Sequence, residues 1–214
     1  IEYKSSENLI IGIDLGATYM RGCLVDLEAR FLSEIQIPTE IDNGLESILE
    51  KLIETINKLS ERAKPNQKIW GVGIGVAGLI NHETGVVEKS PDFDWKNVNL
   101  RELIKSRIPF PIYFDNSTRL MAKGEKELGR YKKESNFAVI NVGYGIATGL
   151  VVNNSLLHGN KGFTGEIGHI QIQPNSKIKC ECGKYGCLEA LASGRRIAQM
   201  GKERLSLENI HQIS

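Results

Sequence analysis

Three cysteines and one histidine gather in a short glycine-rich stretch. Cys180, Cys182 and Cys187 fall within eight residues, and His169 precedes them. One imidazole and three thiolates form a familiar tetrahedral Zn²⁺ set, and a site filled by four protein ligands is structural and not hydrolytic. The alternative is a group of buried, reduced thiols unrelated to His169. Because three clustered thiols and the distant Cys23 do not make a disulfide framework, the pattern favours zinc.

Two carboxylates flank this cluster. Glu166 precedes His169 by three residues, and Glu189 follows Cys187 by two. A loop fixed by a metal could aim both into a pocket, where carboxylates accept hydrogen bonds from the hydroxyl groups of a neutral polyol. The alternative for each glutamate is a solvated surface charge.

Two strand–turn–strand segments carry further polar chemistry. The first turn holds Asp14, Gly16 and Thr18, and the second holds Gly143 and Gly145. Bare backbone amides in such a turn can approach a phosphate, and the acid can hold a hydrated Mg²⁺. Plain hairpin turns are the alternative. Since each turn opens a three-stranded unit, the two turns together indicate phosphate binding more strongly than either turn alone.

The elements that must position these residues follow from hydrophobic patterning. Apolar residues recur at helical spacing between Leu45 and Leu59, which predicts a helix there. Asp42 or Asn43 can cap its start, and Pro65 ends it. Strands are expected over residues 9–14, 19–26, 30–37, 68–76, 86–89, 111–115, 137–142 and 146–152. Helices are expected over 100–106, 116–128 and 189–200, with 153–186 rich in loops. This order indicates an α/β fold with a mixed sheet and helices on its faces.

Composition narrows the classes of protein. The chain has 214 residues, 41% of them hydrophobic, and a formal charge of +1. These values are typical of a soluble globular protein and exclude long disorder. The near-neutral charge argues against a dedicated nucleic-acid binder, and no apolar run reaches the ~20 residues that span a bilayer. Reduced cysteines and the lack of a signal-peptide pattern predict a cytoplasmic location. We also expect that Ile1 is not the natural start and that residues are missing after Ser214.

The motifs together resemble those of the ROK family, which comprises bacterial sugar kinases and sugar-responsive repressors with an actin/hexokinase-like fold. The resemblance runs from Leu9 to Met200. Its matching segments are Asp14-x-Gly-x-Thr18 for the first phosphate loop, Gly73-Ile-Gly-Val-Ala-Gly78 for the sugar loop, Glu166-x-x-His169, and Cys180-x-Cys182-Gly-x-x-Gly186-Cys187-x-Glu189.

The resemblance implies an actin/hexokinase-like (RNase H-like) α/β fold with mixed sheets, flanking helices, two lobes and a zinc-containing loop. It divides the chain into a linker-like tail (1–8), an N-terminal lobe (9–130) and the start of a truncated C-terminal lobe (131–214). It assigns structural zinc to His169, Cys180, Cys182 and Cys187. Sugar contacts are expected from Gly78, Asp92, Asn116, Ser117, Glu166, His169 and Glu189.

One departure from the family concerns the catalytic base. Family kinases carry Asn-Asp-x-Asn, and aligning on residues 124–125 places Ser117 at the catalytic Asp and Arg119 at the second Asn. A serine cannot remove a proton unaided, and Asp115 is the only nearby substitute. The Asp115 side chain would start ~7 Å further back if both residues lie in a strand.

Two more departures affect the binding loops. The family's second phosphate loop, Gly-Thr-Gly-x-Gly, reads Gly143-Tyr-Gly145-Ile-Ala147, which loses a hydroxyl and a glycine. Asp92 stands where an Asn is usual in the sugar site. The sugar set therefore survives better than the phosphate-transfer set.

This pattern favours the sugar-sensing portion of a ROK-type transcriptional regulator. Its expected partners are a monosaccharide effector, further copies of the chain, and DNA only through a helix-turn-helix domain outside residues 1–214; no membrane is expected. The alternative is an ATP-dependent glucokinase or N-acetylhexosamine kinase, which would need ATP and Mg²⁺. A folded remnant without either activity is the third possibility, and simple sugar binding would exclude it. The identity of the sugar stays open.

Overall fold

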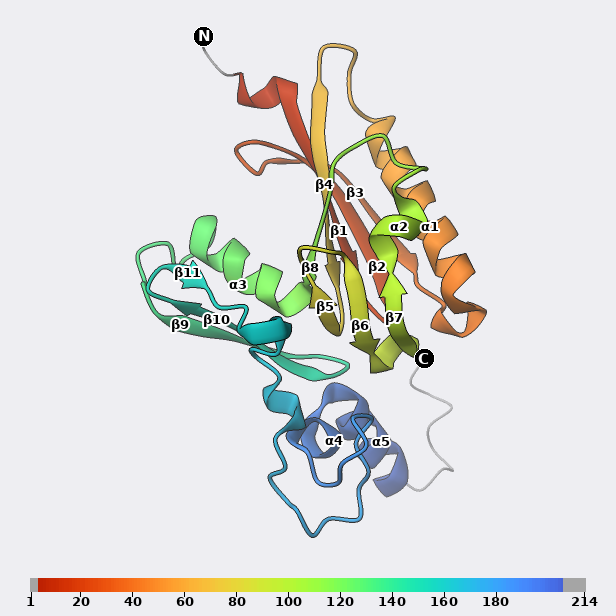
Figure 1. The fold of residues 1–214 in the computed structure, drawn as a ribbon, viewed down its shortest axis with the longest axis vertical. Helices are drawn as coiled ribbons and strands as arrows, with labels where there is room; N and C mark the ends of the chain where they lie inside the picture. Colours follow the sequence, from red (N-terminus) through yellow and green to blue (C-terminus); the bar gives the residue numbers. More distant parts are fainter. Residues whose placement is uncertain (1–3, 206–214) are drawn as a thin grey trace.

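The computed structural model describes residues 4–205, and its main sheet has five strands in the order β3-β2-β1-β4-β8 (Figure 1). Strand β1 pairs antiparallel with β2 and parallel with β4, which pairs parallel with β8. Their bounds are β1 (Asn8–Leu15), β2 (Tyr19–Asp26), β3 (Phe31–Pro38), β4 (Lys68–Val76) and β8 (Ile112–Asn116). Since Leu15 pairs with Val76 and Val76 with Asn116, the carboxyl ends of the parallel strands meet at one edge.

Helix α1 (Gly44–Ser60) covers one face of this sheet, as its periodicity predicts. Its buried residues are Ile48, Leu49, Leu52, Ile53, Thr55, Ile56 and Leu59. Each buried aliphatic side chain contributes about 1.5–3 kcal/mol. The expected side-chain cap is wrong: neither Asp42 nor Asn43 caps the helix. The 3-10 turn η2 (Ile41–Asn43) enters the helix directly, so Asn43 is already helical and not extended as a capping residue must be.

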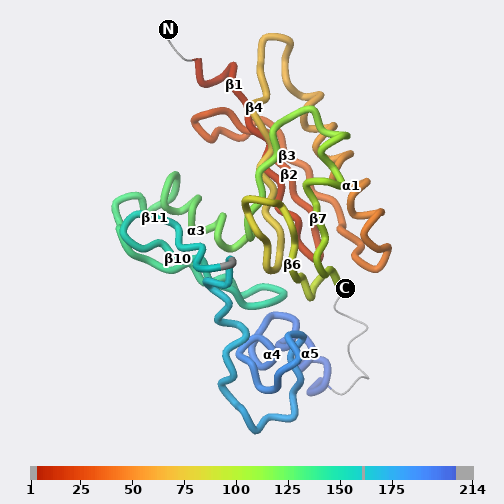
Figure 2. Tube along the Cα trace, viewed as in Figure 1, coloured from red at the N-terminus to blue at the C-terminus, as the bar shows by residue number. Residues whose placement is uncertain are grey.

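Two smaller sheets flank the main one. The first has the order β5-β6-β7, with β5 (Leu79–Asn81), β6 (Val86–Ser90) and β7 (Trp95–Asn99), and α2 (Leu100–Ile104) follows it. The second has the order β11-β10-β9, with β9 (Phe137–Val142), β10 (Ile146–Val152) and β11 (Ser155–Leu156). Helix α3 (Ser117–Glu127) packs on β10 and β9 and begins where β8 ends (Figure 2).

The last part of the described chain is loop-rich, as expected, and ends in two helices. The helix expected over 189–200 is instead α4 (Leu188–Ala192) followed by α5 (Gly194–Arg204). Ser193 separates them because its backbone is extended and its side chain accepts a hydrogen bond from Arg196 N. No helix among residues 4–205 is long and apolar enough to cross a membrane.

The start of the described chain is partly ordered into regular structure. Of the expected linker-like tail, Ser5–Glu7 form the 3-10 turn η1 and β1 already starts at Asn8. Residues 1–3 and 206–214 lie outside the described residues.

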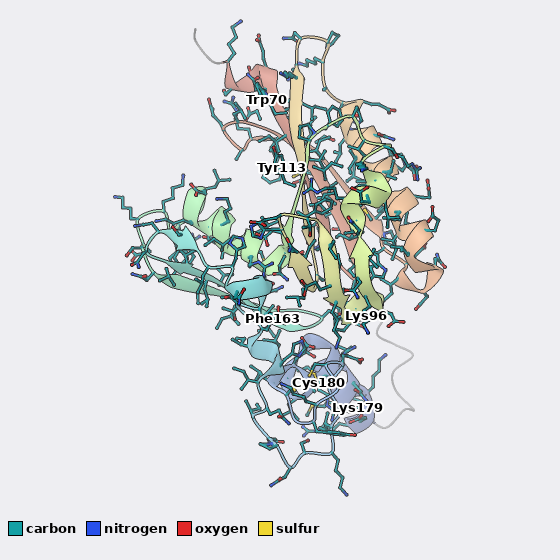
Figure 3. The ribbon with its side chains drawn as sticks, viewed as in Figure 1. Trp70, Lys96, Tyr113, Phe163, Lys179 and Cys180 are labelled. Atoms are coloured by element: carbon teal, nitrogen blue, oxygen red, sulfur yellow. The ribbon has the colours of Figure 1, made fainter. Side chains whose placement is uncertain are left out.

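Trp70 and Tyr113, which are 43% and 65% exposed, project from the main sheet on the side away from α1 (Figure 3).

Candidate functional site

The carboxyl-end edge of the main sheet opens onto a cleft of about 850 Å³. The cleft also takes in segments from both smaller sheets and from the loops that follow them. The residues expected from the sequence that line it are Asp14, Gly16, Thr18, Gly78, Asp92, Asn116, Ser117, Gly143, Gly145, Glu166, His169 and Glu189. The fold thus brings the expected sugar and phosphate-loop residues to one place.

The turn between β1 and β2 forms one wall of the cleft. Gly16 N donates to Tyr19 O at 3.2 Å, and a Cβ at Gly16 would lie 2.9 Å from that oxygen, so only glycine fits. Asp14 projects from the end of β1, where Ser117 Oγ donates to its Oδ1 at 3.0 Å. Arg21, its partner across the hairpin, lies 3.7 Å from Oδ2. The carboxylate therefore faces Ser117 and one cation.

Asn116 has a structural task that the sequence does not reveal. Its Oδ1 caps α3 by accepting from Thr118 N at 2.9 Å and from Arg119 N at 3.1 Å. Its Nδ2 donates to Gly78 O at 2.9 Å. An amide carries two N–H donors, so one N–H of Asn116 is left for a ligand. Asn116 can therefore present a donor to the cleft.

Glu189 anchors the second glycine turn. Its Oε2 accepts from Ile146 N at 2.8 Å, and a Cβ at Gly145 would clash with the same oxygen. Gly143 O accepts from Gly194 N at 2.9 Å. The turn is thereby fastened to α4 and α5, and Oε1 of Glu189 is the oxygen left for a ligand.

Two of the cleft's carboxyl groups are shifted toward the neutral form. Burial, and then the nearby Glu189 charge, raise the pKa of Asp92. Burial raises the pKa of Glu166 as well, against opposing contributions from His169 and Arg119. A buried carboxyl group with a raised pKa lowers the stability of the folded protein at neutral pH, and such groups are typical of binding sites.

Replacing Asp92 by Asn is expected to stabilise the protein at neutral pH. The folded state binds the Asp92 proton more tightly than the unfolded chain, so stability falls as pH rises through the raised pKa. Asp92→Asn removes that cost and should gain about 0.5–2 kcal/mol at pH 7, with the gain vanishing near pH 4. Urea unfolding at both pH values measures it, with Glu83→Gln in an exposed turn as control. Equal stabilities of Asp92→Asn and wild type at pH 7 would contradict the expectation.

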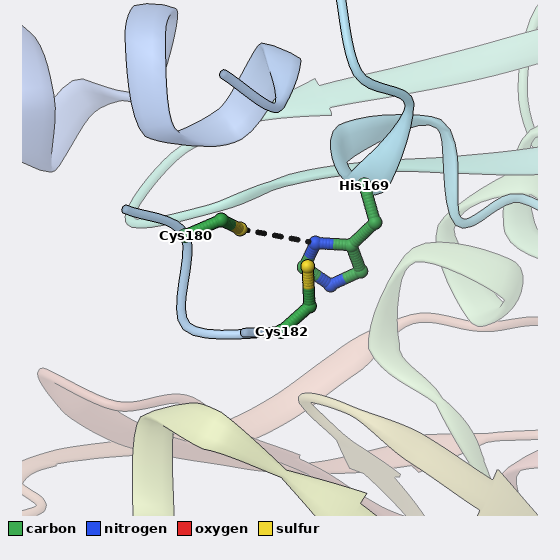
Figure 4. A group of neighbouring side chains, drawn as sticks. All are labelled: His169, Cys180 and Cys182. Atoms are coloured by element: carbon green, nitrogen blue, oxygen red, sulfur yellow. Dashed lines mark hydrogen bonds between the residues drawn. The ribbon is translucent and has the colours of Figure 1, made fainter. Parts of the chain in front are cut away.

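The cysteine–histidine cluster, formed by His169, Cys180, Cys182 and Cys187, lies beside the cleft. The first three could together hold a metal ion (Figure 4), and the expected fourth ligand, Cys187, is not part of that group of three. The ligand atoms of His169, Cys180 and Cys182 all lie within 4.8 Å of one another. Cys180 Sγ is 3.5 Å from His169 Nδ1, and Cys187 Sγ is 3.7 Å from Cys182 Sγ. Burial and the two thiol neighbours raise the pKa of Cys187 to about 12. A bound divalent cation would instead favour the deprotonated form of Cys187, because metal ions bind thiols as thiolates.

The two ring nitrogens of His169 face different groups. Its Nδ1 points to the thiols, whereas its Nε2 lies 3.8 Å from Glu166 Oε2 in the cleft. The two nitrogens of one imidazole can serve different partners. His169 therefore connects the cysteine cluster to the cleft.

Asp115 lies outside the cleft. It lines a second cavity of about 240 Å³, and its Oδ1 accepts from Arg119 Nε at 2.7 Å. Oδ2 lies 2.9 Å from His158 Nε2, which must carry a proton because a carboxylate only accepts. Burial alone would raise the pKa of Asp115, but the Arg119 charge and three hydrogen bonds hold it below its ordinary value. The structure therefore keeps this carboxylate out of the cleft that Ser117 lines, bound to Arg119 and His158.

The cleft also contains residues that the sequence patterns did not single out as ligands. Arg21 and Tyr144 line it, and the Arg195 guanidinium lies 5.0 Å from the centre of the Tyr144 ring. Arg195 also pairs with Glu181 at 3.3 Å. The hairpin register, which sets Arg21 opposite Asp14, could have revealed Arg21. No sequence signal pairs Tyr144 with Arg195.

Comparison with known proteins gives a consistent picture. The ROK family profile matches residues 10–214. A putative xylose repressor from Caldicellulosiruptor sp. (strain Rt8B.4) is 36% identical over 203 residues, which are 94% of this chain and 51% of the relative. A ROK family glucokinase from Streptomyces griseus, solved with glucose and AMPPNP, has a TM-score of 0.83 and 31% identity, covering 92% of this chain and 61% of its own.

A ROK family transcriptional regulator, a homologue of the E. coli MLC protein, shares the fold too. Its structure has a TM-score of 0.79 and 29% identity, covering 94% of this chain and 50% of its own. The chain thus spans about half the length of the repressor and regulator and about three fifths of the glucokinase. Both a kinase and a regulator therefore cover more than nine tenths of this chain.

Proposed function

Because this chain belongs to the ROK family, we propose that it is the sugar-sensing part of a transcriptional regulator, which binds a monosaccharide in the cleft without phosphorylating it efficiently. DNA would be contacted through a helix-turn-helix domain outside this chain. The protein is proposed to act in the cytoplasm as a homo-oligomer. Residues 9–130 and 131–214 would belong to two lobes that meet at the cleft.

The observation that carries this proposal is the environment of Ser117. A neutral serine occupies the position that the family resemblance gives to the catalytic base, and its hydroxyl is already donated to Asp14. Asp115 is engaged with Arg119 and His158 in the second cavity. A sugar hydroxyl placed at Ser117 would therefore meet carboxylates that already hold partners, since Asp14 accepts from Ser117 and lies beside Arg21. A general base must be aligned on the proton that it removes.

One observation favours the kinase alternative. Asp14, Gly16 and Thr18 still line the cleft beside Ser117. The Streptomyces griseus relative holds glucose together with AMPPNP. An ATP-dependent sugar kinase would place Mg²⁺ near Asp14, the hard oxygen ligand that this cation prefers. Phosphorylation assays separate the two functions.

We also propose that zinc occupies the cysteine–histidine cluster as a structural ion. A tetrahedral zinc ion has sulfur ligands at ~2.3 Å and nitrogen ligands at ~2.0–2.1 Å, which puts ligand atoms about 3.5–3.8 Å apart. The Cys180–His169 and Cys182–Cys187 separations of 3.5 and 3.7 Å support this ion. Zinc would hold the loop that carries Cys180 and Cys182 and orient His169 from behind the cleft.

Sugar binding is expected to depend strongly on Glu166. Glu166→Ala would leave sugar hydroxyls buried and unpaired at a cost of about 1–3 kcal/mol, or roughly 5- to 150-fold in affinity. Calorimetry of the full-length protein against pentoses, hexoses and N-acetylhexosamines measures this loss, with Glu127→Ala at the exposed end of α3 as control. The sensor proposal fails if wild type binds no sugar in the panel.

A further inference from the structure

Arg119 is a buried cation in the first turn of α3, with its side chain 1% exposed. Its guanidinium donates to three acceptors from different parts of the chain. Nε reaches Asp115 Oδ1 at 2.7 Å, one terminal nitrogen reaches Gly162 O at 2.8 Å, and the other reaches Ile80 O at 3.3 Å. A planar guanidinium sets these directions rigidly, so it fixes the three segments relative to one another.

The carboxylate of Asp115 extends this set of contacts. Its Oδ1 also accepts from Asn116 N at 2.7 Å, and His158 Nε2 lies 2.9 Å from its Oδ2. The ring of His82 stacks on His158 at 4.3 Å between centroids. Arg119, Asp115 and His158 are called the Arg119 network below.

The segments that the Arg119 network joins all carry candidate sugar contacts. His158 and Gly162 precede Glu166 in one loop, which is folded by a hydrogen bond from Thr164 N to His158 O. Asn116 follows Asp115 directly, and its side chain binds the Gly78 carbonyl. Arg119 is not among the described residues that line the cleft, so it can act on a ligand only through these neighbours.

We propose that Arg119 is a positioning residue for the sugar site. It clamps the loop of residues 158–166, and with it Glu166, against the β8–α3 junction that carries Asn116. This inference rests on the proposed sugar-binding function. The positioning role would explain why Arg119 occupies the position of the second Asn in the family's Asn-Asp-x-Asn motif.

Arg119→Lys tests the clamp because lysine keeps the charge beside Asp115 but loses the planar fork that reaches Gly162 and Ile80. Calorimetry of the full-length protein with D-glucose and D-xylose should show an affinity about tenfold lower in this variant. Arg107→Lys is the matched control, since Arg107 makes a bidentate pair with Glu50 on the exposed surface. The control should bind as wild type does.

Two readouts separate positioning from a general loss of stability. Amide exchange in residues 158–166 should be at least about tenfold faster in Arg119→Lys, while Cys180 N and Gly183 N, whose hydrogen bonds lie in the cysteine loop, keep their rates. In a Glu166→Gln background, Arg119→Lys should cost less affinity than it does alone, because its effect passes through Glu166.

Several results would overturn the inference. These are a folded Arg119→Lys variant with wild-type affinity, additive losses in the double variant, or exchange that rises equally across the chain. If wild type binds neither sugar, the proposed function fails for these ligands. The exchange pattern alone then decides whether Arg119 holds the loop.

Discussion

Cys182→Ser is expected to abolish binding of the proposed zinc ion and to weaken sugar binding by about 10–100-fold. Cys182 provides a thiol within 4.8 Å of the His169 ligand nitrogen, and the other nitrogen of His169 faces Glu166 in the cleft. If zinc binds as proposed, the loss of one ligand would free the loop over residues 174–187, and the orientation of His169 in the cleft would change with it. Metal analysis of protein purified without added zinc, followed by calorimetry, measures both effects.

The matched control for this variant is Cys23→Ser. Cys23 is a half-buried thiol in β2, remote in the fold from the cysteine loop, and its Sγ packs near Gly12. Wild type and Cys23→Ser should each hold close to one equivalent of zinc. Metal-free wild-type protein with an intact loop would contradict the zinc assignment, and full sugar affinity in metal-free Cys182→Ser would contradict the coupling to the cleft.

Sugar phosphorylation is expected to be at least about 10²-fold slower than in typical kinases, which turn over at roughly 1–100 s⁻¹. Ser117 has no useful basicity at neutral pH, so the sugar hydroxyl loses its proton unassisted. Tyr144 adds a second expected defect because it lines the cleft within the turn whose amides would hold the transferring phosphate. A coupled assay of ADP release, using full-length protein and the sugar that binds best, measures the rate.

Ser117→Asp should raise that rate. The new carboxylate would stand next to Asp14, whose Oδ1 lies 3.0 Å from the present hydroxyl, and like charges at this distance raise the pKa of one acid toward the range of a useful base. ADP release without sugar serves as the blank. Turnover of wild type at about 1 s⁻¹ or above would make the protein a sugar kinase and refute the sensor proposal.

The elements with strong periodicity could be predicted from the sequence. The apolar repeat of α1, the apolar run of β1 and the alternation of β2 and β3 are long enough to identify each element. Strands β5 and β7 were missed because they are short and depend on pairing with β6. The break at Ser193 was also missed, since its extended backbone and cap compete with a pattern that reads as one helix.

Many of the residues that line the cleft could be named from the sequence, but the directions and partners of their side chains could not. The motifs named many of the residues that line the cleft, and those at Asp14, Gly78 and Asn116 sit at or just after the ends of strands. Asp115 looks close to Ser117 in the sequence, yet its carboxylate is bound by Arg119 and His158 in the second cavity and does not line the cleft. Arg119 is only four residues further on, but its other acceptors, Gly162 and Ile80, are distant in sequence and leave no local pattern.

The order of strands in the main sheet has a consequence for folding. The meander of β1, β2 and β3 can form from neighbouring residues, but β1 must then wait for β4, and β4 for β8, across long intervening segments. Such distant pairings close slowly because chain entropy is lost before contacts are gained. During synthesis the main sheet can close once Asn116 has emerged, whereas the cleft needs Glu189 as well. A nascent chain would therefore pass through a state with a finished sheet and a half-built cleft.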